Sequence, residues 1–227
     1  MAIERIADTG VNDVYKTLCQ KILTFEGRVL VGIDGKDASG KTRFADGFAT
    51  YLAAHTERQV MRVSLDDFFN PRRIRKQNPD EPRGCYEDTF DYSAIRNKLL
   101  VPFKSKGEYV EKTFDYNLDA YVKAEEKCAT PETILVIDGV FLQRAEMVDF
   151  WDVVVLLRVE GDVAIERGTR RDAERIGDYG SARKKFTERY IASQKLYYDE
   201  CHPEEKADIV VDNTDFLNPR IVKVQDD

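Results

Sequence analysis

Short runs of Val, Ile and Leu recur along the chain, with little of the polar alternation expected of a half-exposed strand. They lie at Arg28–Ile33, Val60–Leu65, Thr133–Ile137, Asp152–Val159 and Ala207–Val211. Near-continuous apolar runs of this length are typical of strands covered on both faces, as in a parallel sheet.

Between these runs, apolar residues recur at the spacing of a helix. Because strands and helices alternate, the chain is predicted to form an α/β sandwich with a mostly parallel central sheet. A first helix is expected around Val14, Leu18, Ile22 and Phe25, and others over Thr42–Ala54, Ser93–Val101, Asp162–Arg175 and Ala182–Glu200.

The interval from Pro71 to Cys128 interrupts this alternation. It is rich in Arg, Pro, Asp and Tyr, and holds one clear helix followed by two alternating segments, Tyr109–Phe114 and Tyr121–Lys127. Asn117 and Asp119 lie between these segments, where a turn would form. We interpret residues 71–128 as an insertion with a hairpin that covers the active end of the sheet.

Length and charge narrow the functional classes. At 227 residues the chain suits a single domain, over 1–227, with a full hydrophobic core. Its formal net charge of −7 disfavours nucleic acid or an anionic membrane surface as the main partner, since both favour a basic footprint. A local basic pocket for phosphates is compatible with this negative net charge.

Cysteine spacing and hydropathy add two expectations. The four cysteines and two histidines do not show zinc-ligand spacing, so reduced thiols are expected. The longest apolar runs, such as Val153–Leu157, are too short to span a bilayer, and a cytoplasmic protein is expected.

The strongest chemical signal is a match to G-x-x-x-x-G-K-[ST] between a predicted strand and a predicted helix. In such a loop the backbone N–H groups curl around phosphates, and the helix N-terminus adds positive potential. Lys41 would reach the β- and γ-phosphates of ATP, and the Thr42 hydroxyl would bind magnesium. A glycine-rich turn without a ligand is the structural alternative. The candidate nucleotide-binding residues are Gly35, Lys36, Asp37, Ala38, Ser39, Gly40, Lys41 and Thr42, of which Asp37 is unusual because its carboxylate lies close to the phosphates.

Two acidic motifs follow predicted strands. Asp66 and Asp67 come after the strand Val60–Leu65, at the end of the sheet where ligands bind in open α/β folds. Asp66 could accept a proton from an attacking hydroxyl or hold magnesium, and which member of the pair is the base stays open. Asp138 ends an apolar strand like a Walker B acid, which would contact magnesium directly or through water. A turn or a helix cap is the structural alternative for both motifs.

The predicted helix Asp162–Arg175 carries Arg167, Arg171 and Arg175 on one face, with Arg170 beside them. Like charges at this spacing repel unless acids or a bound anion compensate them, so a solvated, salt-bridged face is one interpretation. In a phosphoryl-transfer enzyme, arginines from a mobile lid stabilise the transferring group. On that interpretation residues 162–181 form a lid, and Arg167 and Arg171 are catalytic candidates.

These motifs, in this order, resemble the uridine kinase and phosphoribulokinase family of P-loop kinases over residues 28–215, and the tail resembles a bacterial uridine-kinase-like subgroup. Thr89-Phe90-Asp91 and Lys112–Tyr116 belong to the same pattern. The resemblance implies a three-layer P-loop kinase sandwich that uses ATP and Mg²⁺. It also implies a nucleoside-like small-molecule acceptor, phosphorylated on a 5′-hydroxyl, and is compatible with a homo-oligomer.

The resemblance also suggests individual roles. Asp66 matches the base toward the 5′-hydroxyl, and Phe69 matches an aromatic residue of the sugar and base pocket. Asp91 matches an acid that holds ribose hydroxyls, while Arg167 and Arg170 match lid arginines. Asp138 stands where uridine kinases usually carry Glu.

Two positions depart from the family pattern. Phe114 replaces a tyrosine on the hairpin, and Asp119 lies near the place of a histidine that reads the pyrimidine. As substrate-binding candidates these residues favour cytidine or a cationic riboside over uridine. Nicotinamide riboside and pantothenate are alternative acceptors. A GTP-dependent switch is disfavoured because no Asn-Lys-x-Asp element is present, and a regulatory module without phosphotransfer is the remaining alternative.

Overall fold

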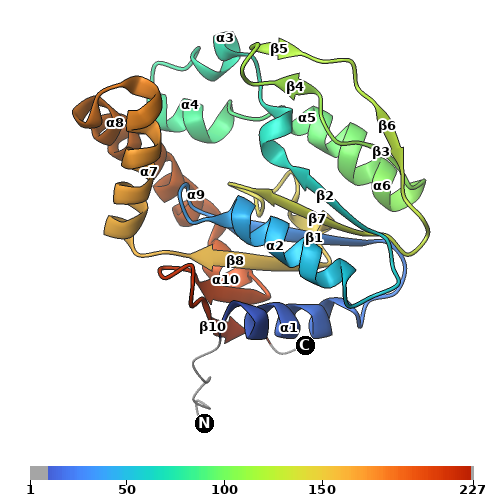
Figure 1. Ribbon diagram of the computed structural model, residues 1–227. Coiled ribbons are helices and arrows are strands. Elements are labelled where there is room, and N and C mark those ends of the chain that lie inside the picture. Colours follow the sequence, from blue (N-terminus) through green and yellow to red (C-terminus); the bar gives the residue numbers. More distant parts are fainter. Residues whose placement is uncertain (1–9, 226–227) are drawn as a thin grey trace.

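The computed structural model describes residues 10–225, and its centre is a six-stranded sheet with the order β10-β9-β8-β1-β7-β2 (Figure 1). Five strands are parallel, and only β10, at the edge, runs antiparallel to its neighbour β9. A mostly parallel sheet is therefore confirmed. The strands are β1 (Val29–Gly35), β2 (Val60–Ser64), β7 (Ile134–Gly139), β8 (Val153–Arg158), β9 (Ile209–Asp212) and β10 (Arg220–Val224).

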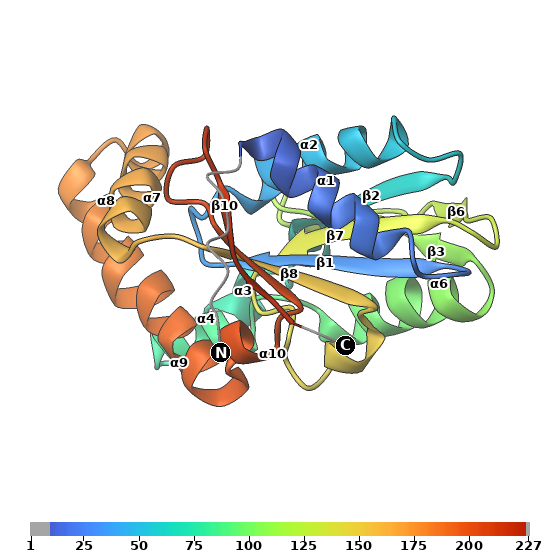
Figure 2. The same ribbon diagram turned by 90° about the horizontal axis from the view of Figure 1, so that it is seen from below.

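Both faces of the sheet are covered, which explains why its strands are apolar throughout. All seven residues of β1 are buried; Val31 and Ile33 pack with α1 (Val11–Ile22) and α2 (Lys41–Ala53), whereas Leu30 packs with the opposite layer. Figure 2 shows α1 and α2 on one side of the sheet and α9 on the other. The three layers follow from this alternation of side chains along buried strands.

The insertion contains more structure than the sequence indicated. Its clear helix is longer than predicted and runs through α5 (Tyr92–Ala94), a helical turn (Ile95–Leu100) and α6 (Val101–Ser105). Two shorter helices that we did not predict precede it, α3 (Arg72–Arg75) and α4 (Glu81–Glu87). They were not predicted because a helix of four to seven residues has too few turns to show a helical period of apolar residues.

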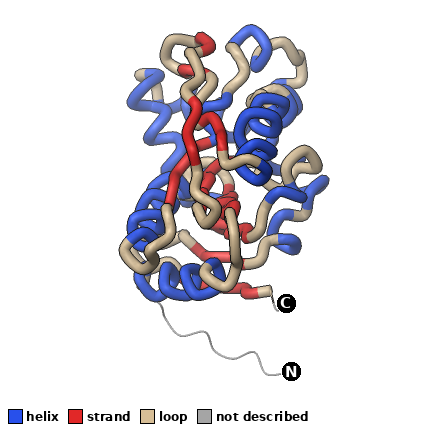
Figure 3. The backbone as a smooth tube through the Cα atoms, turned by 90° about the vertical axis from the view of Figure 1, so that its right-hand side faces the viewer, coloured by secondary structure: helices blue, strands red, loops and turns tan. Residues whose placement is uncertain are grey.

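The predicted hairpin is present as two short ladders on the same pair of chain segments. Its base pairs β3 (Glu108–Val110) with β6 (Glu126–Cys128), and its tip pairs β4 (Phe114–Asp115) with β5 (Ala120–Tyr121). Figure 3 shows these strands above the main sheet. The tip therefore reaches over the end of the sheet where β1 enters the phosphate-binding loop.

The arginine-rich segment forms two helices at the side of the sheet, α7 (Gly161–Ile176) and α8 (Tyr179–Lys185), with Gly177 between them (Figure 1). A helical segment (Phe186–Ile191) then leads into α9 (Ala192–Cys201) and α10 (Pro203–Lys206). Gly168 lets the helices pack closely, because a Cβ at that position would lie 1.9 Å from the Phe186 ring.

Across residues 10–225, no helix combines the length and the apolar character needed to cross a membrane.

Candidate active site

The phosphate-binding loop connects β1 to α2, as the motif predicted. A Cβ at Gly35 would lie 2.9 Å from the Leu157 carbonyl oxygen, which leaves room only for glycine. Gly40 has φ 85°, in the left-handed region that favours glycine, and Lys41 begins the helix. The Nζ of Lys41 lies back over the loop, 3.4 Å from the Lys36 carbonyl oxygen. The loop thus brings an ammonium group and a helix N-terminus together, as phosphate binding requires.

Two hydrogen bonds from other segments hold the middle of the loop in place. The buried Ser39 offers its carbonyl oxygen to the Nδ2 of Asn213 at 2.7 Å. The carboxylate of Asp37 accepts a hydrogen bond from the Nε2 of Gln194, on α9, at 2.7 Å. Ala38 adopts φ 62°, which is uncommon for a residue other than glycine. These contacts fix the loop in its curved form.

A buried carboxylate that the sequence did not single out lies directly behind the loop. Asp34 is fully buried and accepts hydrogen bonds from the Gly35 N–H at 2.8 Å, the Gln143 Nε2 at 3.0 Å and the Tyr197 hydroxyl. Burial raises the pKa of Asp34, although the three hydrogen bonds oppose the change. Through Tyr197, this network ties the start of the loop to α9.

Thr42 and Asp138, the two magnesium candidates besides Asp66, lie in contact. The Thr42 hydroxyl donates to Asp138 Oδ2 at 2.6 Å, and the other carboxylate oxygen accepts from Arg62 Nη2 at 2.7 Å. Arg62 also pairs with Asp46 at 3.0 Å. Asp138 is almost fully buried, so the guanidinium compensates a charge that would otherwise be costly. Arg62 could not be recognised from the sequence, because it lies within an apolar strand.

The Thr42 hydroxyl and the Asp138 carboxylate are hard oxygen donors, the kind that Mg²⁺ prefers. Among the described residues, no group of three or more His, Cys, Asp or Glu side chains could hold a metal on its own. These two facts fit a magnesium ion that is bound jointly with nucleotide phosphates, because Mg²⁺ commonly takes one or two protein ligands and fills its shell with phosphate and water.

Asp66 and Asp67 point in different directions. Both lie in the short helical turn Leu65–Phe68 after β2, but Asp66 opens into a cavity whereas Asp67 pairs with Lys112 of the hairpin at 3.3 Å. Surrounding protein atoms desolvate Asp66 and raise its pKa to about 6; Lys41 lowers the pKa, and Asp138 raises it further.

The cavity has a volume of about 810 Å³. It lies between the phosphate-binding loop, the segment 66–90, the hairpin tip and the helices α7 and α8, which form the predicted lid. Five of the predicted site residues line it, namely Asp37, Asp66, Phe69, Asp119 and Arg171. The structure therefore brings together residues from four segments that are far apart in the sequence.

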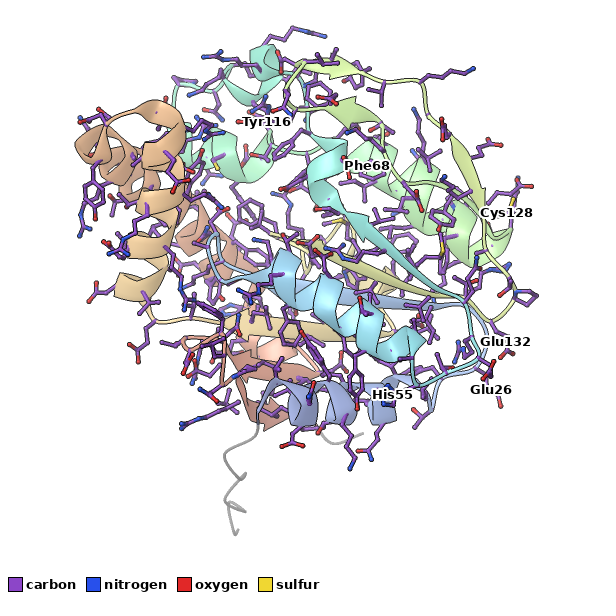
Figure 4. All side chains as sticks on the ribbon, in the orientation of Figure 1. Glu26, His55, Phe68, Tyr116, Cys128 and Glu132 are labelled. Carbon is purple, nitrogen blue, oxygen red and sulfur yellow. The ribbon has the colours of Figure 1, made fainter. Side chains whose placement is uncertain are left out.

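Aromatic rings form one wall of the cavity. Phe69 stacks on Phe90 with ring centroids 5.0 Å apart, and Tyr116 lies 5.2 Å from Phe69. Figure 4 shows Tyr116 between the hairpin and the lid helices. Burial opposes ionisation of its phenol, but hydrogen bonds and positive charge from Arg175 and Arg75 outweigh that effect and lower the pKa of Tyr116.

Basic residues outnumber acidic ones around the cavity, seven to four. The acidic ones are Asp37, Asp66, Asp119 and Asp172. The basic ones come from α3 (Arg72, Arg75 and the adjoining Lys76), from α7 (Arg171 and Arg175) and from the segment after the lid tip (Lys185 and Arg189).

Two residues carried over from the family pattern do not reach the cavity. Phe114 is fully buried and packs edge-on against Tyr121, with ring centroids 5.7 Å apart. Asp91 accepts a hydrogen bond from the Ala94 N–H at 2.8 Å and so caps α5. Their contacts are those of a core aromatic residue and a helix cap.

Three further candidates have protein partners. Asp119 accepts hydrogen bonds from the Arg72 N–H at 2.8 Å and from Arg75 Nη2 at 3.1 Å, so its charge is already compensated. Arg170 pairs with Glu166 on the exposed face of α7. Arg167 donates to the carbonyl oxygens of residues 213 and 214 at 3.3 and 2.5 Å and does not line the cavity.

Four residues that line the cavity were not among the predicted site residues, namely Arg75, Tyr116, Lys185 and Arg189. Tyr116 lies in the quoted segment Lys112–Tyr116, and its aromatic ring was an available signal. The three cations lie in charged segments that resemble ordinary solvated surface, and only packing directs them inward.

The sequence model of the phosphoribulokinase / uridine kinase family matches residues 30–220. A uridine kinase of Latilactobacillus sakei subsp. sakei (strain 23K) is 23% identical over 189 residues, covering 78% of this chain and 85% of that protein. Uridine-cytidine kinase 2-B of Danio rerio is 23% identical over 211 residues, covering 87% and 79%. The solved structure of a possible uridine kinase from Bacillus stearothermophilus has a TM-score of 0.71 at 25% identity and covers 88% of this chain and 98% of that one.

Proposed function

The chain belongs to the phosphoribulokinase / uridine kinase family, and from that premise we propose that it transfers the γ-phosphate of ATP to a hydroxyl of a small molecule. One observation carries the proposal. Asp37 of the phosphate-binding loop and Asp66 line a cavity of about 810 Å³, a size suited to a small ligand, and the charges of Lys41 and of Asp138, the partner of Thr42, act on the Asp66 carboxylate.

We assign the phosphate-binding roles as follows. Residues 35–42 hold the phosphates through backbone N–H groups, and Lys41 neutralises their charge. Thr42 and Asp138 would hold Mg²⁺, which when bound stabilises negative charge on the β- and γ-phosphates. Arg171, on the cavity side of α7, stabilises the transferring group. Arg167 instead fixes α7 against the segment 213–214.

Asp66 is the proposed general base. Its carboxylate opens into the cavity, whereas the Asp67 carboxylate is paired with Lys112. A pKa of about 6 suits a base that must be ionised near neutral pH and still accept a proton. The proton of the attacking hydroxyl passes to Asp66 as the oxygen attacks the γ-phosphorus and the bond to the ADP oxygen breaks.

For the acceptor we propose a compound of nucleoside size, because two proteins of similar sequence are named as a uridine kinase and a uridine-cytidine kinase. Phe69 and Tyr116 would stack against its ring. The expected preference for cytidine or a cationic riboside depended on a free carboxylate at Asp119. Because Arg75 compensates that carboxylate, we do not include this preference in the proposal.

The test is ADP release by the purified protein with a panel of nucleosides and vitamins, with and without Mg²⁺. We expect release that depends on both the acceptor and Mg²⁺, and that disappears in Lys41→Ala. Nucleotide hydrolysis that no acceptor stimulates would favour a switch or regulatory module instead.

A further inference from the structure

The cavity and the whole chain have opposite charge balances. The chain has a formal net charge of −7, yet seven basic and four acidic residues line the cavity. Two of the basic residues, Arg171 and Arg175, lie on the lid helix α7 and have Asp172 as a partner, at 3.1 and 3.6 Å. Asp172 therefore compensates part of the positive charge of these two arginines.

Three other cations form what we call the acceptor wall, together with Phe69 and Tyr116. They are Arg75, Lys185 and Arg189. The Arg75 guanidinium lies 4.8 Å from the Tyr116 ring centroid and 5.4 Å from that of Phe69, and its Nε donates to the Asn70 carbonyl oxygen at 2.7 Å. The wall thus has a fixed guanidinium between aromatic rings.

Arg189 is the most buried of these cations, with 8% of its side chain exposed. Its Nη2 donates to the Arg75 carbonyl oxygen at 3.2 Å. The carboxylate paired with it, Glu81, is 3.8 Å away, more than half exposed and shared with Lys76. A buried cation with so weak a partner is costly unless a ligand compensates it.

Lys185 is half-buried and lies 5.2 Å from the Tyr190 ring centroid. Within the described part of the chain, no carboxylate lies within ion-pair distance of it. Burial lowers its pKa, the positive charge of Arg175 lowers it further, and Asp172 opposes the change. Lys185 therefore lies where positive charge is in excess.

The acids that face the cavity do not cancel this excess. Asp119 is bonded to Arg75, and Asp172 to the two lid arginines. Asp37 accepts a hydrogen bond from Gln194, and the Asp66 carboxylate lies in the electrostatic field of Lys41. A neutral acceptor would leave the wall uncompensated, and a cationic one would be repelled by it.

On the basis of the proposed kinase function, we propose that the acceptor carries an anionic group, a carboxylate or a phosphate ester, that is bound by Arg189 and Lys185, next to Arg75, whose charge Asp119 compensates. Guanidinium groups pair with either anion through two parallel hydrogen bonds, so the two share one recognition chemistry. With its anion on this wall, the acceptor extends its hydroxyl across the cavity toward Asp66.

The test compares related acceptors that carry or lack an anionic group. One set is uridine, orotidine, which adds a carboxylate, and uridine 3′-phosphate; the other is ribose, ribonate and ribose 5-phosphate. Binding is measured by calorimetry with a non-hydrolysable ATP analogue and Mg²⁺ present, and turnover by ADP release. In at least one set, we expect a charged compound to bind at least tenfold more tightly than its neutral counterpart, and the better anion identifies the class.

Neighbouring residues supply matched controls. Lys185→Gln and Arg189→Gln should each weaken the charged compound at least tenfold and leave the neutral one and the ATP analogue unchanged. Lys184→Gln, an exposed neighbour outside the cavity, should change nothing, and Arg189→Lys should restore part of the affinity. Circular dichroism shows whether each variant is folded.

Neutral compounds that bind as well as or better than charged ones in both sets would overturn the proposal, as would equal behaviour of Lys185→Gln and Lys184→Gln. Failure of the kinase function has a different signature. Charged compounds would still bind preferentially, but none of them would stimulate ADP release.

Discussion

The two sides of the cavity are assembled in different ways. The phosphate side is one continuous segment, residues 35–42, whose backbone conformation is set by glycines and by the start of α2. The acceptor wall draws its members from three separate segments: α3 and the residues before it, the hairpin tip, and the stretch from the end of α8 onward. Substitutions on the phosphate side should therefore affect every reaction of the enzyme, whereas those on the acceptor wall should change only which compound is used.

The largest effect is expected from Lys41→Ala, on the phosphate side. It removes the ammonium that follows the migrating charge, so kcat should fall by about 10³-fold with every acceptor. ADP release measures kcat, and circular dichroism verifies the fold. A folded Lys41→Ala protein with nearly normal turnover would contradict the loop assignment.

Asp66, between the two sides, should show the next largest effect. Asp66→Asn cannot accept a proton and should lower kcat by about 10²-fold while ATP binding persists. Because the carboxylate must be ionised and its pKa is about 6, kcat/KM of the native protein should fall as the pH drops below 6. A pH series for both proteins measures this decrease in kcat/KM, which should be absent in Asp66→Asn. If Asp67→Asn is the more damaging change, the wrong member of the pair has been assigned.

Arg62 supports the phosphate side from within the sheet. Arg62→Gln leaves the buried Asp138 without its cation, so the unfolding free energy without Mg²⁺ should fall by about 2 kcal/mol. Added Mg²⁺ should recover part of this loss, because it can take the place of the guanidinium charge. Urea unfolding with and without Mg²⁺ measures both changes. The control is Asp46→Asn, which removes the exposed partner of Arg62 and should cost under about 1 kcal/mol.

The smallest effect is expected from Asp119→Asn, on the acceptor side. Because Arg75 already compensates this carboxylate, the ratio of kcat/KM for cytidine to that for uridine should change by less than about threefold, or about 0.7 kcal/mol. Parallel assays of the two nucleosides measure the ratio. A larger loss of cytidine preference would return Asp119 to the role of a base-reading residue.

The sheet was predictable because burial on both faces produces long apolar runs, and each such run became a strand. The antiparallel edge strand β10 was missed, since Val222 and Val224 alternate with polar residues in a short exposed segment. The family resemblance, which depended on the order of motifs, is confirmed by the match over residues 30–220.

Within the site, the sequence indicated residues whose chemistry depends on local backbone geometry. Glycines at 35 and 40 and the start of a helix at Lys41 define a phosphate-binding loop wherever they occur in this order. The proximity of Thr42 and Asp138 could also be expected, because Asp138 lies at the end of one parallel strand and Thr42 at the start of the helix that follows another.

The acceptor wall was decided only by tertiary structure. Whether Arg189 is a surface charge or a buried ligand group depends on how α3, the hairpin and the helix after the lid pack together, and no local pattern records that packing. The same packing buries Phe114, exposes Tyr116 to the cavity and joins Asp119 to Arg75. The sequence by itself thus determined that the chain has a P-loop kinase fold with a phosphate site at the end of β1. The charge that the acceptor meets was set by long-range packing, because the cations of the acceptor wall lie as far apart along the chain as Arg75 and Arg189, which are separated by 114 residues.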